Sequence, residues 1–101
     1  MNGARIEVGE GGRLSVNGDL TFISVPGVIR DGERLIGQGA TVSLDLSGVQ
    51  RADSAGVALL VEWMRVAARR EATLTLLNMP AQMLAIARVS GLDSILPLAR
   101  S

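Results

Sequence analysis

The segment 40–78 constrains the fold more than any other part of the sequence. Residues 40–46 ("ATVSLDL") and 72–78 ("ATLTLLN") carry apolar residues at the period of half-buried strands. Residues 54–70, between them, carry apolar residues at helical spacing, after a connecting loop predicted at 47–53. Two strands joined through a helix lie parallel, with a right-handed connection. This segment therefore predicts a β-α-β unit.

The N-terminal part of the chain predicts a hairpin followed by a weak helix. Residues 4–8 ("ARIEV") and 13–18 ("RLSVNG") alternate as short strands, and "GEGG" between them supplies a turn. Asn17-Gly18 is expected to end the second strand. Residues 24–39 hold an apolar stripe after Pro26, but three glycines interrupt it at about 1 kcal/mol each relative to alanine. We expect a short or broken helix there.

The C-terminal part predicts one more helix. Asn78 is a candidate N-cap, Pro80 suits the first turn, and Gly91 suits the end of the helix. Residues 92–98 form a short closing element that stops at Pro97. The chain is expected to be one α/β domain over 1–101. Its small mixed β-sheet of four to five strands should carry helices mainly on one side.

Composition excludes several classes of function. Ten basic and ten acidic residues leave no net charge, and Phe22 and Trp63 are the sole aromatics, so nucleic-acid binding is not expected. Cysteine and histidine are absent, which removes thiolate and imidazole metal sites. The first twelve residues lack a signal-peptide core, and the longest apolar run is Val57–Val61. We expect a cytoplasmic protein with no cofactor and no metal.

The polar elbow "ADSAG" (52–56) separates the predicted strand from the helix. Asp53 or Ser54 can accept a hydrogen bond from a backbone N–H of the first helical turn, and Gly56 allows a close backbone approach. The Ser54 hydroxyl can also contact a partner or accept a phosphate, which the helix N-terminus would stabilise. A nucleophilic serine needs a base, but histidine is absent and all ten basic residues are arginine. An acyl-transfer enzyme is therefore not expected.

The helix predicted at 54–70 is apolar on more than one side. One stripe consists of Val57, Leu60, Val61, Met64 and Ala68. A second row consists of Leu59, Trp63 and Val66, and it needs a second cover. That cover is either a neighbouring helix of this domain or another protein, and Trp63 would be the anchor of such an interface. The partner hypothesis places Leu59, Trp63 and Val66 with Asp53, Ser54 and Gly56 in one binding surface, left open by the domain itself.

The strand "VSLDLSGV", the elbow "DSAGVALL", the strand "TLTLLN" and the ending "MPAQMLAIARVSGLDSILPL" together resemble the STAS domain family. The resemblance covers roughly residues 13–98 and implies the fold of bacterial anti-sigma-factor antagonists and of sulfate-transporter tails. Ser54 falls on the hydroxyl position that the antagonists phosphorylate, and Asp53 and Gly56 match their family positions.

Within the family, "DSAGVALLVEWMRVA" is most similar to the MlaB group. That resemblance implies a non-enzymatic accessory subunit on the cytoplasmic side of the inner membrane of a Gram-negative cell. It would bind the MlaF-like ATPase of a phospholipid ABC transporter, which maintains outer-membrane lipid asymmetry with permease and periplasmic lipid-binding subunits. The antagonists often carry a second serine where this chain has Ala55, and Trp63 is not typical of them. The alternative is an antagonist that acts as a phospho-switch on an anti-sigma kinase, with Ser54 as phospho-acceptor.

Overall fold

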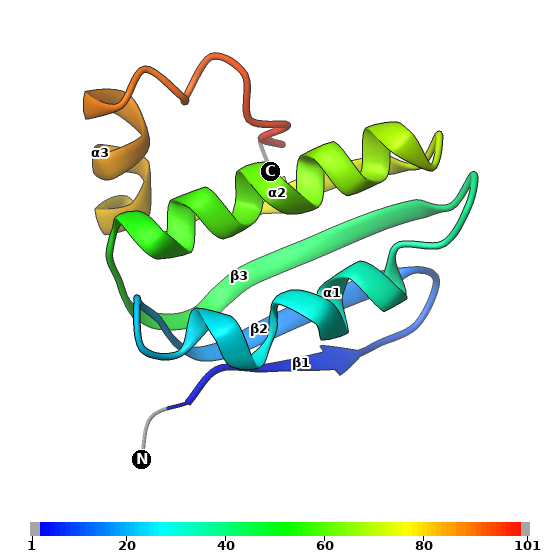
Figure 1. The fold of residues 1–101 in the computed structure, drawn as a ribbon, viewed down its shortest axis with the longest axis horizontal. Coiled ribbons are helices and arrows are strands. Elements are labelled where there is room, and N and C mark those ends of the chain that lie inside the picture. The colour runs from blue at the N-terminus through cyan, green and yellow to red at the C-terminus, as the bar shows by residue number, and fades with distance from the viewer. Residues whose placement is uncertain (1–2, 100–101) are drawn as a thin grey trace.

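The computed structural model describes residues 3–99, so four residues of the predicted domain, 1–2 and 100–101, lie outside the described part (Figure 1). The elements, in chain order, are β1 (Arg5–Val8), β2 (Arg13–Leu20), the 3-10 helix η1 (Val25–Gly27), α1 (Ile29–Leu35), β3 (Thr41–Ala52), α2 (Ser54–Arg69), β4 (Thr73–Leu77) and α3 (Ala81–Val89). The predicted hairpin, the broken helix at 24–39 and the later helices are confirmed.

The four strands form one mixed sheet in the order β1-β2-β3-β4. β1 pairs with β2 antiparallel, and the other pairs are parallel, as the β-α-β unit predicted. Leu98 adds an isolated parallel bridge to Leu76 at the β4 edge. Figure 1 shows α1 and α2 on the same face of the sheet. The predicted α/β class is confirmed, and no helix within residues 3–99 is long and apolar enough to span a membrane.

Two boundaries in the sheet differ from the prediction. β3 continues through the predicted loop at 47–53 as far as Ala52, and β2 continues past Gly18 to Leu20. The two strands support each other here, since Gly18 pairs with Val49 and Leu20 pairs with Ala52 after shifts in register. The polar residues that suggested a loop are exposed positions of a strand, and pairing with a neighbour outweighs their low strand propensity.

The hydrophobic core lies between the sheet and the helices. Alternate residues of β2, β3 and β4 point into it, and α2 meets them with Val57 and Leu60. The predicted main stripe of α2 is thus only partly buried, because Val61 and Met64 are half-buried and Ala68 is exposed. The helix turns a different face inward than the stripe alone suggested.

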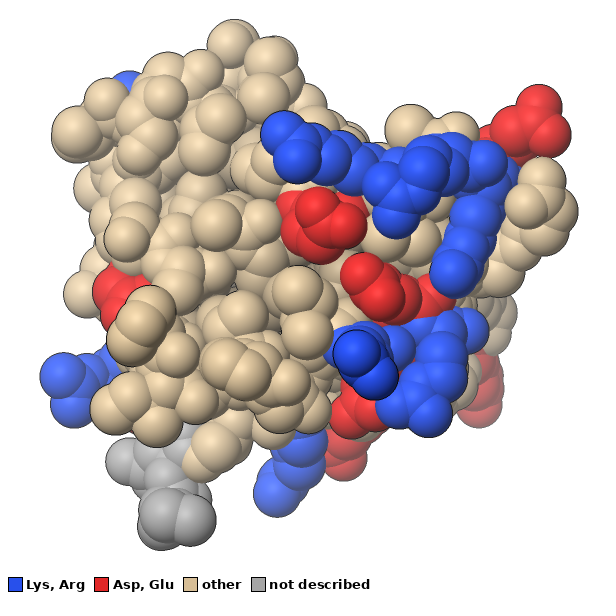
Figure 2. Space-filling view, viewed as in Figure 1, with Lys and Arg blue, Asp and Glu red and all other residues tan. Residues whose placement is uncertain are grey.

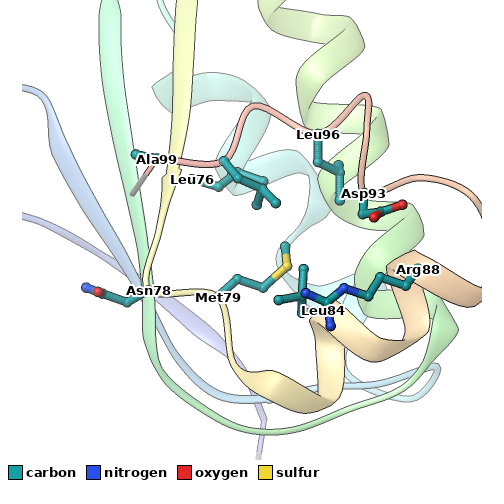
Figure 3. Close-up of a pocket in the computed structure, with 9 residues that line it drawn as sticks. Leu76, Asn78, Met79, Leu84, Arg88, Asp93, Leu96 and Ala99 are labelled. Carbon is teal, nitrogen blue, oxygen red and sulfur yellow. The ribbon is translucent and has the colours of Figure 1, made fainter. Parts of the chain in front are cut away.

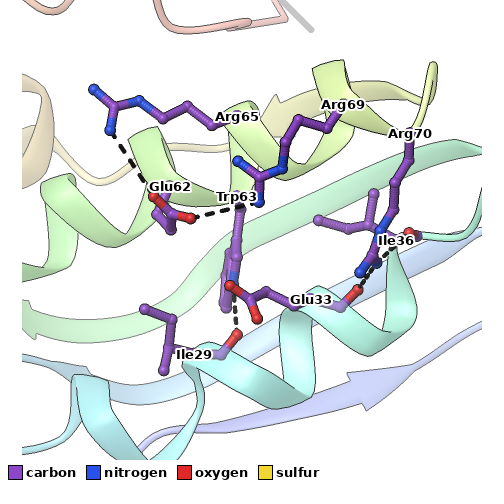
Figure 4. Close-up of polar contacts among 8 residues, drawn as sticks. All are labelled: Ile29, Glu33, Ile36, Glu62, Trp63, Arg65, Arg69 and Arg70. Carbon is purple, nitrogen blue, oxygen red and sulfur yellow. Dashed lines mark hydrogen bonds and ion pairs between the residues drawn. The ribbon is translucent and has the colours of Figure 1, made fainter.

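The second apolar row of α2 is buried within the domain itself, so the predicted open face is wrong. Leu59, Trp63 and Val66 retain 2%, 1% and 1% of their exposure. The indole N–H of Trp63 donates to the carbonyl oxygen of Ile29 at 3.0 Å (Figure 4). Gly32 makes this contact possible, because a Cβ there would lie 2.2 Å from the Trp63 ring. The glycine that weakens α1 is what lets it pack on tryptophan.

Arg70 forms hydrogen bonds with the C-terminal end of α1. Its guanidinium donates to the carbonyl oxygen of Ile36 at 2.9 Å and to that of Glu33 (Figure 4). These carbonyl groups lie at the end of α1, where helical partners are missing. Arg70 therefore acts as a C-terminal cap for a helix of seven residues that has little stability of its own.

Asn78 is not the N-cap of α3, which corrects another prediction. Pro80 occupies the cap position without a side-chain hydrogen bond, and Asn78 adopts a left-handed conformation with φ 56°. Its amide instead donates to Asp45 Oδ1 at 3.2 Å on the open face of the sheet. The backbone N–H of Ser47, followed by the Arg13 guanidinium, holds the pKa of the Asp45 carboxyl well below its usual range. This polar cluster is satisfied by its own members.

Candidate docking surface

The elbow forms where β3 ends and α2 begins. Asp53 is the N-cap, because its Oδ1 accepts from the backbone N–H of Ala55 at 2.9 Å. Of the two candidate caps, Asp53 therefore fills the role. Ser54 is the first helical residue and is exposed, and its hydroxyl has no hydrogen-bond partner among the residues described. The hydroxyl is thus available to a molecule outside the domain.

Asp53 has a second role that the sequence did not suggest. Its Oδ2 accepts from the backbone N–H of Phe22 at 3.0 Å, which anchors the loop between β2 and η1 beside the elbow. The Ser24 hydroxyl holds the same loop from inside, accepting from the N–H of Thr21 at 2.8 Å. With its backbone fixed in this way, the loop presents Phe22 and Ile23 outward, 80% and 90% exposed.

Gly56, in the first turn of α2, allows the end of β2 to pack closely against the elbow. A Cβ on Gly56 would lie 2.5 Å from the carbonyl oxygen of Leu20, so only glycine lets the end of β2 approach the first turn of α2. Gly56 is itself buried. It positions the elbow and offers no contact surface, contrary to the partner-binding role predicted for it.

On the other side of Ser54, α3 contributes an apolar wall. An open hollow of about 390 Å³ lies between them, lined by Ser54, Ala85, Ile86, Val89 and Ser90. Val89 is 91% exposed. The side-chain oxygen of Gln82 accepts from the N–H of Ala52 at 3.1 Å and fixes α3 against the end of β3.

We define the elbow surface as Phe22, Ile23, Ser54, Ile86 and Val89. Figure 2 shows that mostly uncharged residues cover this end of the molecule, around the start of α2 and over α3, with few charged side chains among them, while most charged side chains gather over the other end. The charged end includes Glu62 with Arg65 and Arg69, at 4.0 and 3.9 Å. A hydroxyl between two groups of exposed apolar side chains is an arrangement suited to protein contact.

The structure therefore divides the six predicted partner-binding residues. Asp53 and Ser54 lie together at the elbow, and Gly56 lies beneath them. Leu59, Trp63 and Val66 are buried inside the domain, Trp63 against α1, and are withdrawn as contact residues. Sequence reasoning missed Phe22, Ile23 and Val89. The adjacent pair Phe22-Ile23 in a segment next to Pro26 was a signal, because apolar residues in a loop lack a core position.

A second hollow lies on another side of α3. It has a volume of about 790 Å³, between β4, α3 and the C-terminal segment (Figure 3). Leu76, Met79 and Leu96 form its apolar part, and Arg88 and Asp93 line it as well. Within residues 3–99, no group of three or more acidic side chains is placed to hold a metal ion.

Comparison with protein families gives one match over most of the chain. The family described as "Mlab, STAS domain" matches residues 5–97. None of the curated proteins compared with the chain matches its sequence.

Several solved structures share the fold. An anti-sigma-factor antagonist (STAS) domain protein from Planctomyces limnophilus has a TM-score of 0.76 at 17% identity, covering 95% of this chain and 90% of its own. An anti-sigma factor antagonist from Mycobacterium paratuberculosis has a TM-score of 0.76 at 19% identity, over 97% and 85%. The phosphorylated form of the Bacillus cell fate determinant SpoIIAA has a TM-score of 0.67 at 22% identity, over 97% and 92%.

Proposed function

Because the chain belongs to the STAS domain family, we propose that it is a non-enzymatic docking subunit whose elbow surface binds another protein. The proposed partner is the MlaF-like ATPase of a phospholipid-trafficking ABC transporter. In this proposal the chain lies in the cytoplasm, held at the inner membrane by the ATPase. The permease and the periplasmic lipid-binding subunit would handle the lipid.

The observation that carries this proposal is the exposed Ser54 between two exposed apolar groups, at the end of the molecule that carries few charged side chains. Exposed apolar side chains that gather at one place on the surface, unlike ones scattered singly, mark contact sites. The description of the matching family as "Mlab, STAS domain" supports the transporter as the setting. The absence of histidine and lysine supports a binding role, since Ser54 has neither residue to act as a base.

The apolar residues set a scale for the interaction. Burying Phe22, Ile23 and Val89 would contribute roughly 1.5–3 kcal/mol each. Association itself costs roughly 4–15 kcal/mol, so these three anchors alone would give weak binding. We therefore expect the interface to extend beyond them along α3, and each anchor to matter strongly.

The test is co-purification with the ATPase encoded in the same genome, followed by titration calorimetry. Val89→Asp is expected to weaken binding at least tenfold, which corresponds to about 1.4 kcal/mol. The matched control is Val8→Asp, because Val8 is also exposed, at 68%, but lies on β1, away from the elbow. Ser54→Arg is expected to act like Val89→Asp, with Thr73→Arg as its control, because Thr73 is exposed at the start of β4, at the other end of the sheet from the elbow.

Circular dichroism should show that all four variants are folded. If wild-type protein binds and the two elbow variants bind equally well, the ATPase contacts another surface. If wild-type protein does not bind the ATPase at all, the transporter assignment is wrong.

The alternative function is a serine phospho-switch that binds an anti-sigma kinase. Ser54 is exposed at the N-terminus of a sixteen-residue helix, where the helix dipole would stabilise a phosphate. A structural neighbour, SpoIIAA, has been solved in a phosphorylated form. Intact-mass measurement after incubation with cell extract and ATP distinguishes the two functions. A stoichiometric phosphate that is lost in Ser54→Ala would favour the switch, and an unmodified chain would favour the docking subunit.

A further inference from the structure

Asp19 is a buried carboxylate with an unsatisfied oxygen. It is the next-to-last residue of β2 and retains 9% of its exposure. Its Oδ1 is inaccessible to solvent and has no hydrogen-bond partner within residues 3–99. Buried polar groups in folded proteins almost always have a partner, so an orphan oxygen of this kind needs an explanation.

The carboxylate lines a hollow beside the elbow. This hollow, which we call the acidic socket, has a volume of about 410 Å³ and is lined by Asp19, Thr21, Phe22, Ile23, Arg51 and Asp53. Both oxygens of Asp53 are already engaged by backbone N–H groups of Ala55 and Phe22. Asp19 is therefore the carboxylate of the socket that still lacks a hydrogen-bond donor for its Oδ1 within residues 3–99.

Arg51 is the one basic residue in the lining of the socket. In the described structure it forms no ion pair with Asp19 or Asp53, and it is exposed. The Asp19 carboxylate can therefore accept hydrogen bonds from a group outside the domain. That group must carry a positive charge and several N–H donors, and it must tolerate the apolar side chains at the rim.

We propose that the partner inserts an arginine side chain into the acidic socket, with its guanidinium donating to Asp19. This proposal rests on the docking function and names the chemistry of the contact. Arginine fits better than lysine because its planar guanidinium has five donors, is weakly hydrated and stacks on aromatic rings such as that of Phe22. Phe22 and Ile23 would exclude water around the contact, which strengthens it.

The proposal predicts opposite effects of Asp19→Asn on folding and on binding. The free protein should be as stable as wild type or more stable, because the variant removes a buried charge without removing a partner. Affinity for the ATPase should fall at least tenfold, since a buried charge pair loses one member. The matched control is Glu10→Gln, because Glu10 is exposed in the turn between β1 and β2, at the opposite end of the sheet from the socket. It should change neither quantity.

Urea unfolding and titration calorimetry on the same preparations give both readouts. An Asp19→Asn variant that binds as tightly as wild type would overturn the proposal. So would a fall in stability that Arg51→Gln reproduces and that is not additive in the double variant, because Arg51 would then be the cation for Asp19 in solution.

A titration without any partner tests the socket independently of the proposed function. Two-dimensional NMR spectra are recorded as N-acetylarginine amide is added, and then its uncharged citrulline counterpart. Saturable shifts of the Asp19, Thr21 and Phe22 amides are expected with arginine alone, and they should disappear in Asp19→Asn. Failure of the ATPase to bind, together with these shifts, would reject the transporter and keep the socket. Absence of the shifts would reject the socket even if the ATPase binds.

Discussion

The two ends of α2 differ in how completely the domain satisfies them. At the C-terminal half, Trp63 and Arg70 are bonded to α1, and the exposed charges form ion pairs with each other. At the N-terminal end, the Ser54 hydroxyl has no hydrogen-bond partner among residues 3–99, and apolar side chains are exposed on both sides of it. The place for a partner is thus indicated by exposed groups without contacts inside the domain, at the start of α2. The most apolar part of the helix does not indicate it, because that part is already buried.

The comparison also shows how a short helix can hide an apolar surface. α1 has only seven residues and contains a glycine, so its sequence alone does not predict that it covers the apolar side of α2. The glycine allows contact with the Trp63 ring, and the arginine completes the end of α1. A short helix with low intrinsic stability can therefore cover a large apolar side chain such as Trp63 when specific contacts hold the helix in place.

Replacing Trp63 with alanine is the largest test of this difference. The variant loses a fully buried side chain and its hydrogen bond to Ile29, and the free energy of unfolding should fall by about 3–5 kcal/mol. Urea denaturation followed by circular dichroism measures it. Arg65→Ala, on the exposed side of the same helix, should stay within about 0.5 kcal/mol of wild type. Equal effects of the two variants would contradict the covered row.

Arg70→Met tests the fastening of α1 next. The variant keeps an aliphatic chain but loses two hydrogen bonds from a charged donor, which should cost about 1.5–3 kcal/mol. Hydrogen exchange should quicken at the amides of α1 more than at those of α2. Arg69→Met is the control, because Arg69 makes only an exposed ion pair, worth less than about 1 kcal/mol. Unchanged exchange in α1 would show that another contact holds this helix.

Asp53→Ala tests the elbow itself. Loss of the helix cap costs about 1 kcal/mol, and loss of the bond to Phe22 adds roughly 0.5–1.5 kcal/mol. The Phe22 amide should also exchange faster with solvent. Asp53→Asn keeps one acceptor oxygen and should lie between wild type and Asp53→Ala. If Asp53→Ala affects the helix and leaves the Phe22 amide protected, the anchoring role is wrong.

Ser54→Ala should have the smallest effect on stability, within about 0.5 kcal/mol, because the hydroxyl has no partner within the described part of the chain. The measurement is again urea denaturation, alongside Asp53→Ala. A loss of about 1 kcal/mol or more would mean that Ser54 caps α2. The N-terminal end of α2 would then be hydrogen-bonded within the domain, as its C-terminal end is.

Periodicity predicted most of the fold and only part of the site. The parallel unit and the hairpin follow from local patterns that pairing and packing then reinforce. The extension of β3 does not, because it depends on β2 continuing beside it. Asp53 and Ser54 were found because a cap and a hydroxyl have local signatures. Phe22, Val89 and Asp19 were not, because exposure and an unsatisfied oxygen are properties of the assembled domain.

The sequence by itself determined the α/β class, the elbow and the excess of apolar surface on α2, because spacing along the chain sets which residues share a face. Only the tertiary structure decided which apolar face is covered. That outcome depends on contacts between segments far apart in the sequence, such as Trp63 with Ile29, which are 34 residues apart, and no local pattern encodes the free energy of such contacts. The same packing leaves the elbow surface exposed to solvent.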